Sequence, residues 1–134
     1  MKKVIHFPLL LALTFSVVTA CAQKTKASFV TLSPAQFEEK LHSSGENILI
    51  DVRTADEYRE GHIRNAVQID VNGADFKSEI AKLDKSKPVL LYCAAGVRSE
   101  KAAKILLKEG FTNVFHLEGG ITQWQEEKKT VVKD

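Results

Sequence analysis

The sequence predicts an α/β domain built on a mostly parallel sheet. Short apolar segments typical of buried strands alternate along the chain with segments typical of helices. Two of these helices begin with a capping-box pattern, in which a serine or threonine is followed three residues later by glutamine or glutamate. The 134 residues suffice for one domain, and the apolar and charged fractions, 44% and 27%, are those of ordinary globular proteins.

The first twenty residues are expected to form a signal peptide that the mature protein lacks. Two lysines precede an apolar stretch, residues 6–18, which is too short to span a bilayer comfortably. Small residues then lead to Cys21, a pattern that resembles a bacterial lipoprotein signal, in which the cysteine carries the lipid. Ala22 stands where an aspartate would resemble an inner-membrane retention signal. We expect a periplasm-facing lipid anchor, in the outer membrane rather than the inner; an ordinary signal peptide is the alternative.

Charge and cysteine content narrow the range of functions. Removal of residues 1–20 takes away two of the 19 basic residues and no acid, which leaves 17 basic and 17 acidic residues. This balance gives no support for nucleic-acid binding. The chain has two cysteines, and if Cys21 carries lipid, Cys93 has no partner within the chain. A free thiol in an oxidising compartment is a candidate reactive group.

The domain is expected to open with a helix and a buried strand. The helix lies in TLSPAQFEEKL, with Ser33 as N-cap, Pro34 at the first helical position and Gln36 completing the capping box. The β-branched run NILIDVR, residues 47–53, predicts a strand of a parallel sheet. The chain then divides into a signal peptide 1–20, a tether 21–28, the domain 29–128 and a C-terminal tail 129–134.

Strands and helices continue to alternate in the rest of the chain. Thr54 and Glu57 have the capping-box spacing and predict a short helix. Three more strands are expected, in AVQIDV 66–71, KPVLLYC 87–93 and NVFHL 113–117. Three more helices are expected, in ADFKSEIAKL 74–83, RSEKAAKILLKEG 98–110 and TQWQEE 122–127.

The segment CAAGVRS, residues 93–99, is the candidate site, because sites gather at the carboxyl ends of parallel strands. If Arg98 opens a helix, the preceding residues form a tight loop where backbone N–H groups lack partners and the helix dipole is positive. Small residues there allow these N–H groups to cradle an anion. Cysteines in such places ionise easily, and Arg98 would add a cation with a planar fork of donors. The alternative is a buried structural cysteine beside a solvated arginine.

Three motifs resemble those of the rhodanese family, single-domain type. CAAGVRS resembles that family's active-site loop. DVRTADEYREGHIRNA, residues 51–66, is similar to its first motif, and LEGGITQW, residues 117–124, to its closing motif. The similarity covers roughly residues 29–127, and three motifs in order are far more specific than one. The resemblance implies a five-stranded, mostly parallel sheet with helices on both faces.

The same resemblance implies sulfurtransferase chemistry without a cofactor. Cys93 would take sulfur from a donor such as thiosulfate, hold it as a persulfide and pass it to cyanide or a thiol, a protein thiol included. Arg98 would balance the charge or orient the donor. The residues expected to bind the substrate are Ala94, Ala95, Gly96, Val97 and Ser99. No cluster of residues has the spacing of metal ligands, so we expect no metal.

Two residues of the first motif are expected to support the site. Asp51 and Arg53 are interpreted as a structural ion pair or clamp, since neither has an obvious proton to transfer. His62 is interpreted as a hydrogen-bonded scaffold residue rather than a general base. The motif departs from the family pattern where proline and glycine are replaced by Arg64 and Asn65, so the backbone preference of that turn is expected to differ from that of the family.

Two other functions remain open. Cysteine-dependent phosphatases and arsenate reductases also place a cysteine and an arginine around an anion cradle, commonly with five residues between them. Here four residues separate Cys93 from Arg98, which favours a sulfur-sized group over a phosphate. The third possibility is a lipid-anchored carrier or binding module without catalysis. In each case we expect a monomer.

Overall fold

The computed structural model describes residues 1–3, 27–43 and 45–133. Most of the expected signal peptide, with Cys21, lies outside the described residues. Within them, no helix is long and apolar enough to cross a membrane.

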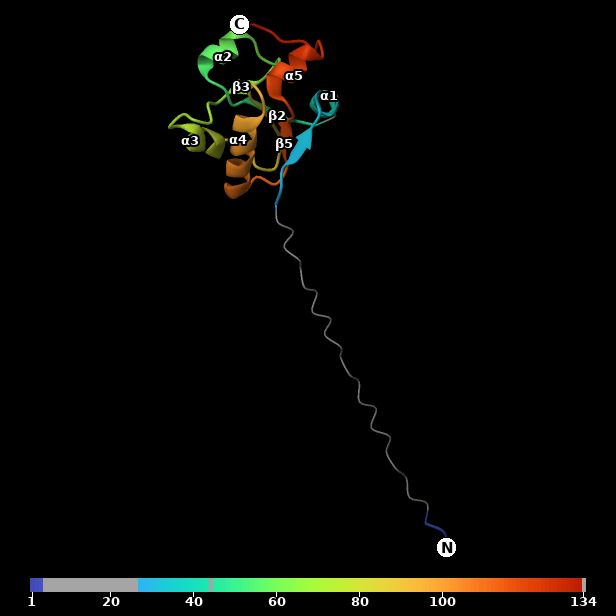
Figure 1. Ribbon diagram of the computed structural model, residues 1–134. Coiled ribbons are helices and arrows are strands. Elements are labelled where there is room, and N and C mark those ends of the chain that lie inside the picture. Colours follow the sequence, from blue (N-terminus) through green and yellow to red (C-terminus); the bar gives the residue numbers. More distant parts are fainter. Residues whose placement is uncertain (4–26, 44, 134) are drawn as a thin grey trace.

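Five parallel strands form one sheet, as the family resemblance implies. The order across the sheet is β1-β5-β4-β2-β3, and all four neighbouring pairs are parallel. Figure 1 shows the fold, with β2, β3 and β5 labelled among the strands. The strands are β1 (Val30–Leu32), β2 (Ile48–Asp51), β3 (Val67–Gln68), β4 (Val89–Tyr92) and β5 (Val114–Leu117). The predicted α/β class is confirmed.

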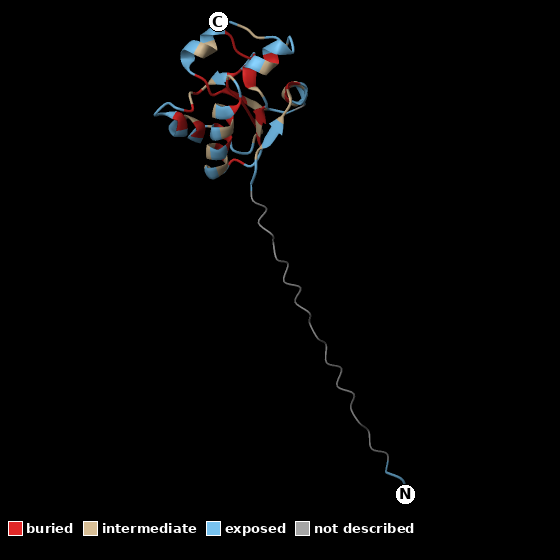
Figure 2. Cartoon of the chain, in the orientation of Figure 1, coloured by how far each residue is buried: buried red, intermediate tan, exposed pale blue. Residues whose placement is uncertain are grey.

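Helices cover both faces of the sheet. The helices are α1 (Pro34–His42), α2 (Ala55–Glu60), α3 (Phe76–Ala81), α4 (Val97–Lys108) and α5 (Gly120–Glu126). Phe76 of α3 and Leu106 of α4 belong to the core on one face, and Phe37 of α1 and Trp124 of α5 to the core on the other. The buried residues gather along the sheet between these layers (Figure 2).

The central strand β4 supplies both cores because successive side chains of a strand point to opposite faces. Val89 and Leu91 lie in the core beneath α3 and α4, whereas Leu90 and Tyr92 lie in the core beneath α1 and α5. All four residues are buried. This burial on both faces explains the continuous apolar run in the sequence.

Both predicted capping boxes are present. The side chain of Ser33 accepts a hydrogen bond from the amide of Gln36, whose side chain accepts one from the amide of Ser33. Thr54 and Glu57 make the same reciprocal pair at the start of α2. These local signals placed both helix starts correctly.

The structure corrects the extent of several strands. The expected strand 66–71 is reduced to two residues, although the amides of Ile69 and Val71 still donate to carbonyls at the end of β2 and just beyond it. Strand β2 ends at Asp51, before Arg53. The edge strand β1 was not expected from its local pattern, because it is only three residues long and largely exposed. Helix α4 begins at Val97, one residue earlier than expected.

Candidate active site

Cys93 follows the central strand β4 directly and begins the loop that leads into α4. Its side chain is buried, with the residue 1% exposed. The Sγ atom accepts a hydrogen bond from the backbone N–H of Gly96 at 3.0 Å and lies 3.6 Å from the hydroxyl of Ser99. The loop therefore curls around the Cys93 sulfur, and the backbone N–H of Gly96 points at that sulfur.

The first turn of α5 holds this loop from one side. The amide of Ile121 donates to the carbonyl of Cys93 at 2.9 Å, and the amide of Thr122 donates to the carbonyl of Ala94 at 3.1 Å. In a planar trans peptide the N–H points away from the preceding carbonyl. The N–H groups of Ala94 and Ala95 are therefore directed away from α5. The closing motif of the sequence thus orients the loop backbone.

Gly120 makes this close approach possible. Its φ of +61° is left-handed, a conformation that L side chains rarely adopt. A Cβ atom there would lie 2.5 Å from the carbonyl oxygen of Cys93 and closer still to that of Ala94. The position therefore requires glycine for both backbone conformation and space.

The other loop residues differ in what they can offer a ligand. Gly96 is buried, caps α4 and has a left-handed φ of +108°. Ala95 is exposed, and Val97 is 80% exposed. Because alanine, glycine and valine have no polar side-chain atoms, any polar contact from these positions must come from the backbone.

The terminal guanidinium nitrogens of Arg98 donate to another side chain and not to the loop. Both nitrogens donate to the carboxylate of Glu57 on α2, at 2.8 and 2.6 Å. The pair is half-buried, and the hydrogen bond from Arg98 lowers the pKa of Glu57 to about 2. The bond to Glu57 also raises the pKa of Arg98, with a smaller contribution from attraction to Cys93. The sequence predicted an isolated cation at Arg98. The structure instead shows an ion pair, in which the Glu57 carboxylate neutralises and orients the Arg98 guanidinium.

Glu57 is a site residue that the sequence reasoning missed. Its spacing from Thr54 explained it as part of a capping box, and its carboxylate does accept from that residue's backbone and hydroxyl. The same carboxylate reaches Arg98, 41 residues away along the chain. No local pattern signals this second role.

Ser99 lies at the centre of a buried polar cluster. Its hydroxyl donates to the carbonyl of Gly96 at 3.0 Å and lies 3.1 Å from Nδ1 of His116 on β5. Nε2 of His116 in turn lies 3.1 Å from the hydroxyl of Thr31 on the edge strand β1. His116 lies in the strand predicted over residues 113–117, and the structure brings it within two hydrogen bonds of the cysteine.

Asp51 and Arg53 form a buried ion pair beside Tyr92, the last residue of β4. Two guanidinium nitrogens of Arg53 donate to the carboxylate of Asp51, at distances from 2.6 to 3.1 Å. Arg53 also donates to the carbonyl of Gly61 at 2.7 Å, and so links the end of β2 to the residue after α2. Burial disfavours the charged guanidinium, but the contact with Asp51 outweighs this and raises the pKa of Arg53. The arrangement is that of a structural clamp.

The turn that departs from the family pattern keeps an unusual backbone conformation. Asn65 has a φ of +67°, in the left-handed region that asparagine tolerates better than most residues. His62 stacks on the ring of Tyr58, and its Nδ1 lies 3.1 Å from that residue's carbonyl. The amide of Ile63 donates to the hydroxyl of Tyr92 at 3.0 Å. His62 therefore belongs to the scaffold of this turn.

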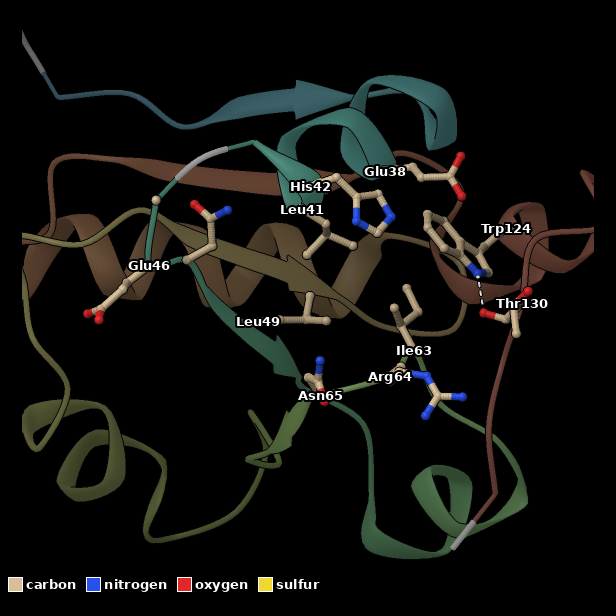
Figure 3. Close-up of a pocket in the computed structure, with 12 residues that line it drawn as sticks. Glu38, Leu41, His42, Glu46, Leu49, Ile63, Arg64, Asn65, Trp124 and Thr130 are labelled. Atoms are coloured by element: carbon tan, nitrogen blue, oxygen red, sulfur yellow. Dashed lines mark hydrogen bonds between the residues drawn. The ribbon is translucent and has the colours of Figure 1, made fainter.

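A cavity of about 610 Å³ lies on the face of the sheet that carries α1 and α5. Figure 3 shows Leu41 and His42 of α1, Leu49 of β2 and Trp124 of α5 around it, with the turn at Ile63 closing one side. The described residues that line it include none of residues 93–99. The cavity is therefore separate from the candidate active site. Among the described residues, no group of three or more His, Cys, Asp or Glu side chains could hold a metal ion.

Comparison with known proteins agrees with this fold and gives the family. The sequence profile described as "Rhodanese-like domain" matches residues 33–127. Among solved structures, a rhodanese-related protein from Thermoplasma volcanium has a TM-score of 0.70 and 28% identity, over 78% of this chain and 99% of that one. A rhodanese-like domain protein from Staphylococcus aureus has a TM-score of 0.68 and 27% identity, over 78% and 98%.

Curated relatives extend the similarity in sequence. The chain is 40% identical over 103 residues to a tRNA uridine(34) hydroxylase of Cytophaga hutchinsonii, over 75% of this chain and 33% of that protein. It is 39% identical to a tRNA uridine(34) hydroxylase of Staphylococcus saprophyticus, over 74% and 32%. The chain thus spans about a third of the length of these relatives.

Proposed function

Since the chain belongs to the family of rhodanese-like domains, we propose that it is a sulfurtransferase in which Cys93 carries the sulfur. The observation that carries the proposal is the hydrogen bond from the Gly96 N–H to the Cys93 Sγ, at the N-terminus of α4. A backbone donor and the positive end of a helix dipole both stabilise negative charge on that sulfur. The donor we propose is thiosulfate, and the acceptor is cyanide or a thiol.

The transfer proceeds in two displacements. The Cys93 thiolate attacks the outer sulfur of thiosulfate, the sulfur–sulfur bond of thiosulfate breaks, and sulfite leaves with that bond's electron pair. The enzyme then holds a persulfide on Cys93. Cyanide attacks the outer sulfur, thiocyanate leaves, and the Cys93 thiolate is regenerated. Every step is a displacement at sulfur, so the cycle needs no added oxidant or reductant.

The loop backbone supports each charged state of this cycle. The peptide groups that follow Cys93 and Ala94 turn their carbonyls to α5, which directs the next two N–H groups away from that helix. Together with the N–H of Gly96, these donors can hold the outer sulfur of a persulfide. The small loop side chains leave the approach to the backbone open.

The hydroxylase activity in the names of the curated relatives is not part of this proposal. The chain matches about a third of their length, and its charge gives no support for nucleic-acid binding. A phosphatase remains the competing enzyme class, because it would use the same cysteine and arginine.

Mass spectrometry tests the proposal. The full chain is exposed to thiosulfate, and the peptide that contains Cys93 should gain the mass of one sulfur atom and lose it on addition of cyanide. Repeated formation of thiocyanate would identify an enzyme, whereas a single transfer to a protein thiol would identify a carrier. Hydrolysis of an aryl phosphate without any sulfur gain on Cys93 would overturn the proposal in favour of a phosphatase.

Gly120→Ala should impair both the fold and the transfer. A left-handed alanine costs about 1–2 kcal/mol, and the added Cβ pushes α5 away from the carbonyls of Cys93 and Ala94. We expect a lower free energy of unfolding and loss of most thiocyanate formation. Gly110→Ala is the matched control: its φ is +94°, but its Cβ would meet only the Lys85 side chain. It should lose stability and keep its activity, and equal activity losses in both variants would contradict the role of Gly120.

We also propose that lipid on Cys21 anchors the protein to the cell envelope, facing the periplasm. The small residues before this cysteine and the short apolar stretch support the proposal. Cys21→Ser should leave the protein unprocessed or release it from the membrane fraction. The measurement is fractionation of cells that express each form. A serine variant that fractionates and migrates as the wild type does would contradict the lipid anchor.

A further inference from the structure

A chain of polar side chains runs from the buried sulfur to the protein surface. Cys93 Sγ lies 3.6 Å from the Ser99 hydroxyl, which lies 3.1 Å from Nδ1 of His116. Nε2 of His116 lies 3.1 Å from the hydroxyl of Thr31. Cys93, Ser99 and His116 are 1%, 0% and 6% exposed, whereas Thr31 is exposed on the edge strand β1.

We propose that His116 accepts the proton of the Cys93 thiol through the Ser99 hydroxyl and so sets the ionisation of the sulfur carrier. His116 is then a positioning residue that acts through Ser99. This inference deepens the proposed function and rests on it for the role of the thiolate.

The proton transfers among Cys93, Ser99 and His116 balance, with no proton gained from or lost to solvent. The Cys93 S–H proton passes to the Ser99 oxygen while the Ser99 hydroxyl proton passes to Nδ1 of His116. The products are a thiolate and an imidazolium. The Ser99 hydroxyl then donates to the thiolate, Nδ1–H of His116 donates to Ser99, and Nε2–H donates to Thr31. Every proton that moves has an acceptor at the observed spacing.

Ser99 can take part because its hydroxyl hydrogen rotates among three neighbours. In addition to Sγ and Nδ1, the Ser99 oxygen lies 3.0 Å from the Gly96 carbonyl, which accepts a hydrogen bond from the Ser99 hydroxyl when the relay is idle. The hydroxyl is fully buried, so water cannot replace any of these partners. The geometry therefore leaves His116 as the base within reach of the Ser99 hydroxyl.

The surroundings of His116 fit a base that becomes transiently charged. Burial lowers the pKa of His116, so the resting imidazole is neutral at pH 7 and can accept a proton. Two carboxylates act in the opposite direction, Glu100 on α4 and Glu118 after β5, and Glu100 is itself paired with Lys104. Their negative charge stabilises the imidazolium once it forms. On the strand side, the Phe29 ring packs against the imidazole in a T-shaped arrangement and adds no charge.

The test measures how fast iodoacetamide alkylates Cys93 between pH 5 and 10, read from the Cys93 peptide of the full chain by mass spectrometry. His116→Gln keeps hydrogen-bonding groups but cannot take a proton. We expect alkylation of His116→Gln to be at least about tenfold slower than that of the wild type at pH 7, because the variant cannot form the thiolate–imidazolium pair. Near pH 10, where hydroxide removes the thiol proton in both proteins, the two rates should be similar. Ser99→Ala should slow alkylation at pH 7 to a similar extent, and the double variant should add little, because both residues act in the same relay.

His42→Gln is the matched control, since His42 is an exposed histidine at the end of α1. It should reproduce the wild-type profile. A wild-type alkylation rate at pH 7 in His116→Gln, with a cooperative thermal transition showing that the variant is folded, would overturn the inference and leave His116 as a structural residue. Should His116→Gln fail to fold, a wild-type alkylation rate at pH 7 in Ser99→Ala would overturn it equally.

The relay and the proposed sulfurtransferase function can fail independently of each other. If Cys93 gains no sulfur from thiosulfate while alkylation at pH 7 slows in both variants, the sulfurtransferase proposal fails and the relay stands. If sulfur transfer is found and alkylation does not slow, the relay fails and the sulfurtransferase proposal stands.

Discussion

Cys93→Ser is expected to abolish sulfur transfer completely. A serine hydroxyl is a much weaker nucleophile than a thiolate, and an oxygen atom cannot form the persulfide on which the proposed cycle depends. The fold should survive, because serine is smaller than cysteine and its oxygen can still accept the N–H of Gly96. Thiocyanate formation and the sulfur gain of the protein should both fall to background, while the unfolding temperature stays close to that of the wild type.

Cys21→Ser provides the control for this experiment. It removes the other cysteine of the chain and should leave sulfur transfer by the solubilised protein unchanged. A Cys93→Ser protein that still turns over thiosulfate at the wild-type rate would show that Cys93 does not carry the sulfur.

Features that depend on neighbouring residues were predictable from the sequence. The two capping boxes placed the starts of α1 and α2, because each box is made within four residues. The apolar run of β4 predicted a buried central strand, and Cys93 does follow the end of that strand, where the candidate site was expected. The three motifs in order then identified the family.

Features that depend on long-range contact were not predictable in the same way. Strand β1 is short and exposed, and it becomes a strand because Thr31 pairs with His116 of β5, 85 residues away. The partner of Arg98 is Glu57, which already had a complete local explanation in its capping box. Sequence spacing gives the types of residue in the site, but the tertiary fold decides which of them meet.

The pairing of Arg98 with Glu57 leads to the second large effect. Arg98→Ala should reduce sulfur transfer roughly ten- to a thousandfold, which corresponds to about 1.4–4 kcal/mol of stabilisation of the charged states. Two causes contribute. The variant loses a cation that attracts the Cys93 sulfur, and it leaves the Glu57 carboxylate without its partner near the loop. Arg98→Lys should recover only part of the loss, because lysine keeps the charge but not the planar fork.

Charge state explains why the unpaired carboxylate matters at neutral pH. The bond to Arg98 is the largest cause that holds the pKa of Glu57 near 2, well below its ordinary 4.5. Without Arg98 the pKa should rise toward the ordinary value, yet the group remains ionised at pH 7. An anion beside the loop repels thiosulfate and the persulfide alike. The loss of activity should therefore persist across the neutral range and ease only below about pH 5, as Glu57 becomes protonated.

Adding Glu57→Gln to Arg98→Ala separates the two causes, because it removes the carboxylate together with its cation. If repulsion by Glu57 dominates, this double variant should regain most of the activity that Arg98→Ala lost. If Arg98 itself stabilises the transferred sulfur, the double variant should stay as impaired as Arg98→Ala. The comparison uses thiocyanate formation at saturating and limiting thiosulfate, so that donor binding and turnover are read apart. If Arg98→Ala alone turned over thiosulfate at the wild-type rate, neither cause would hold. The Arg98–Glu57 pair would then have only a structural role, connecting α2 and α4.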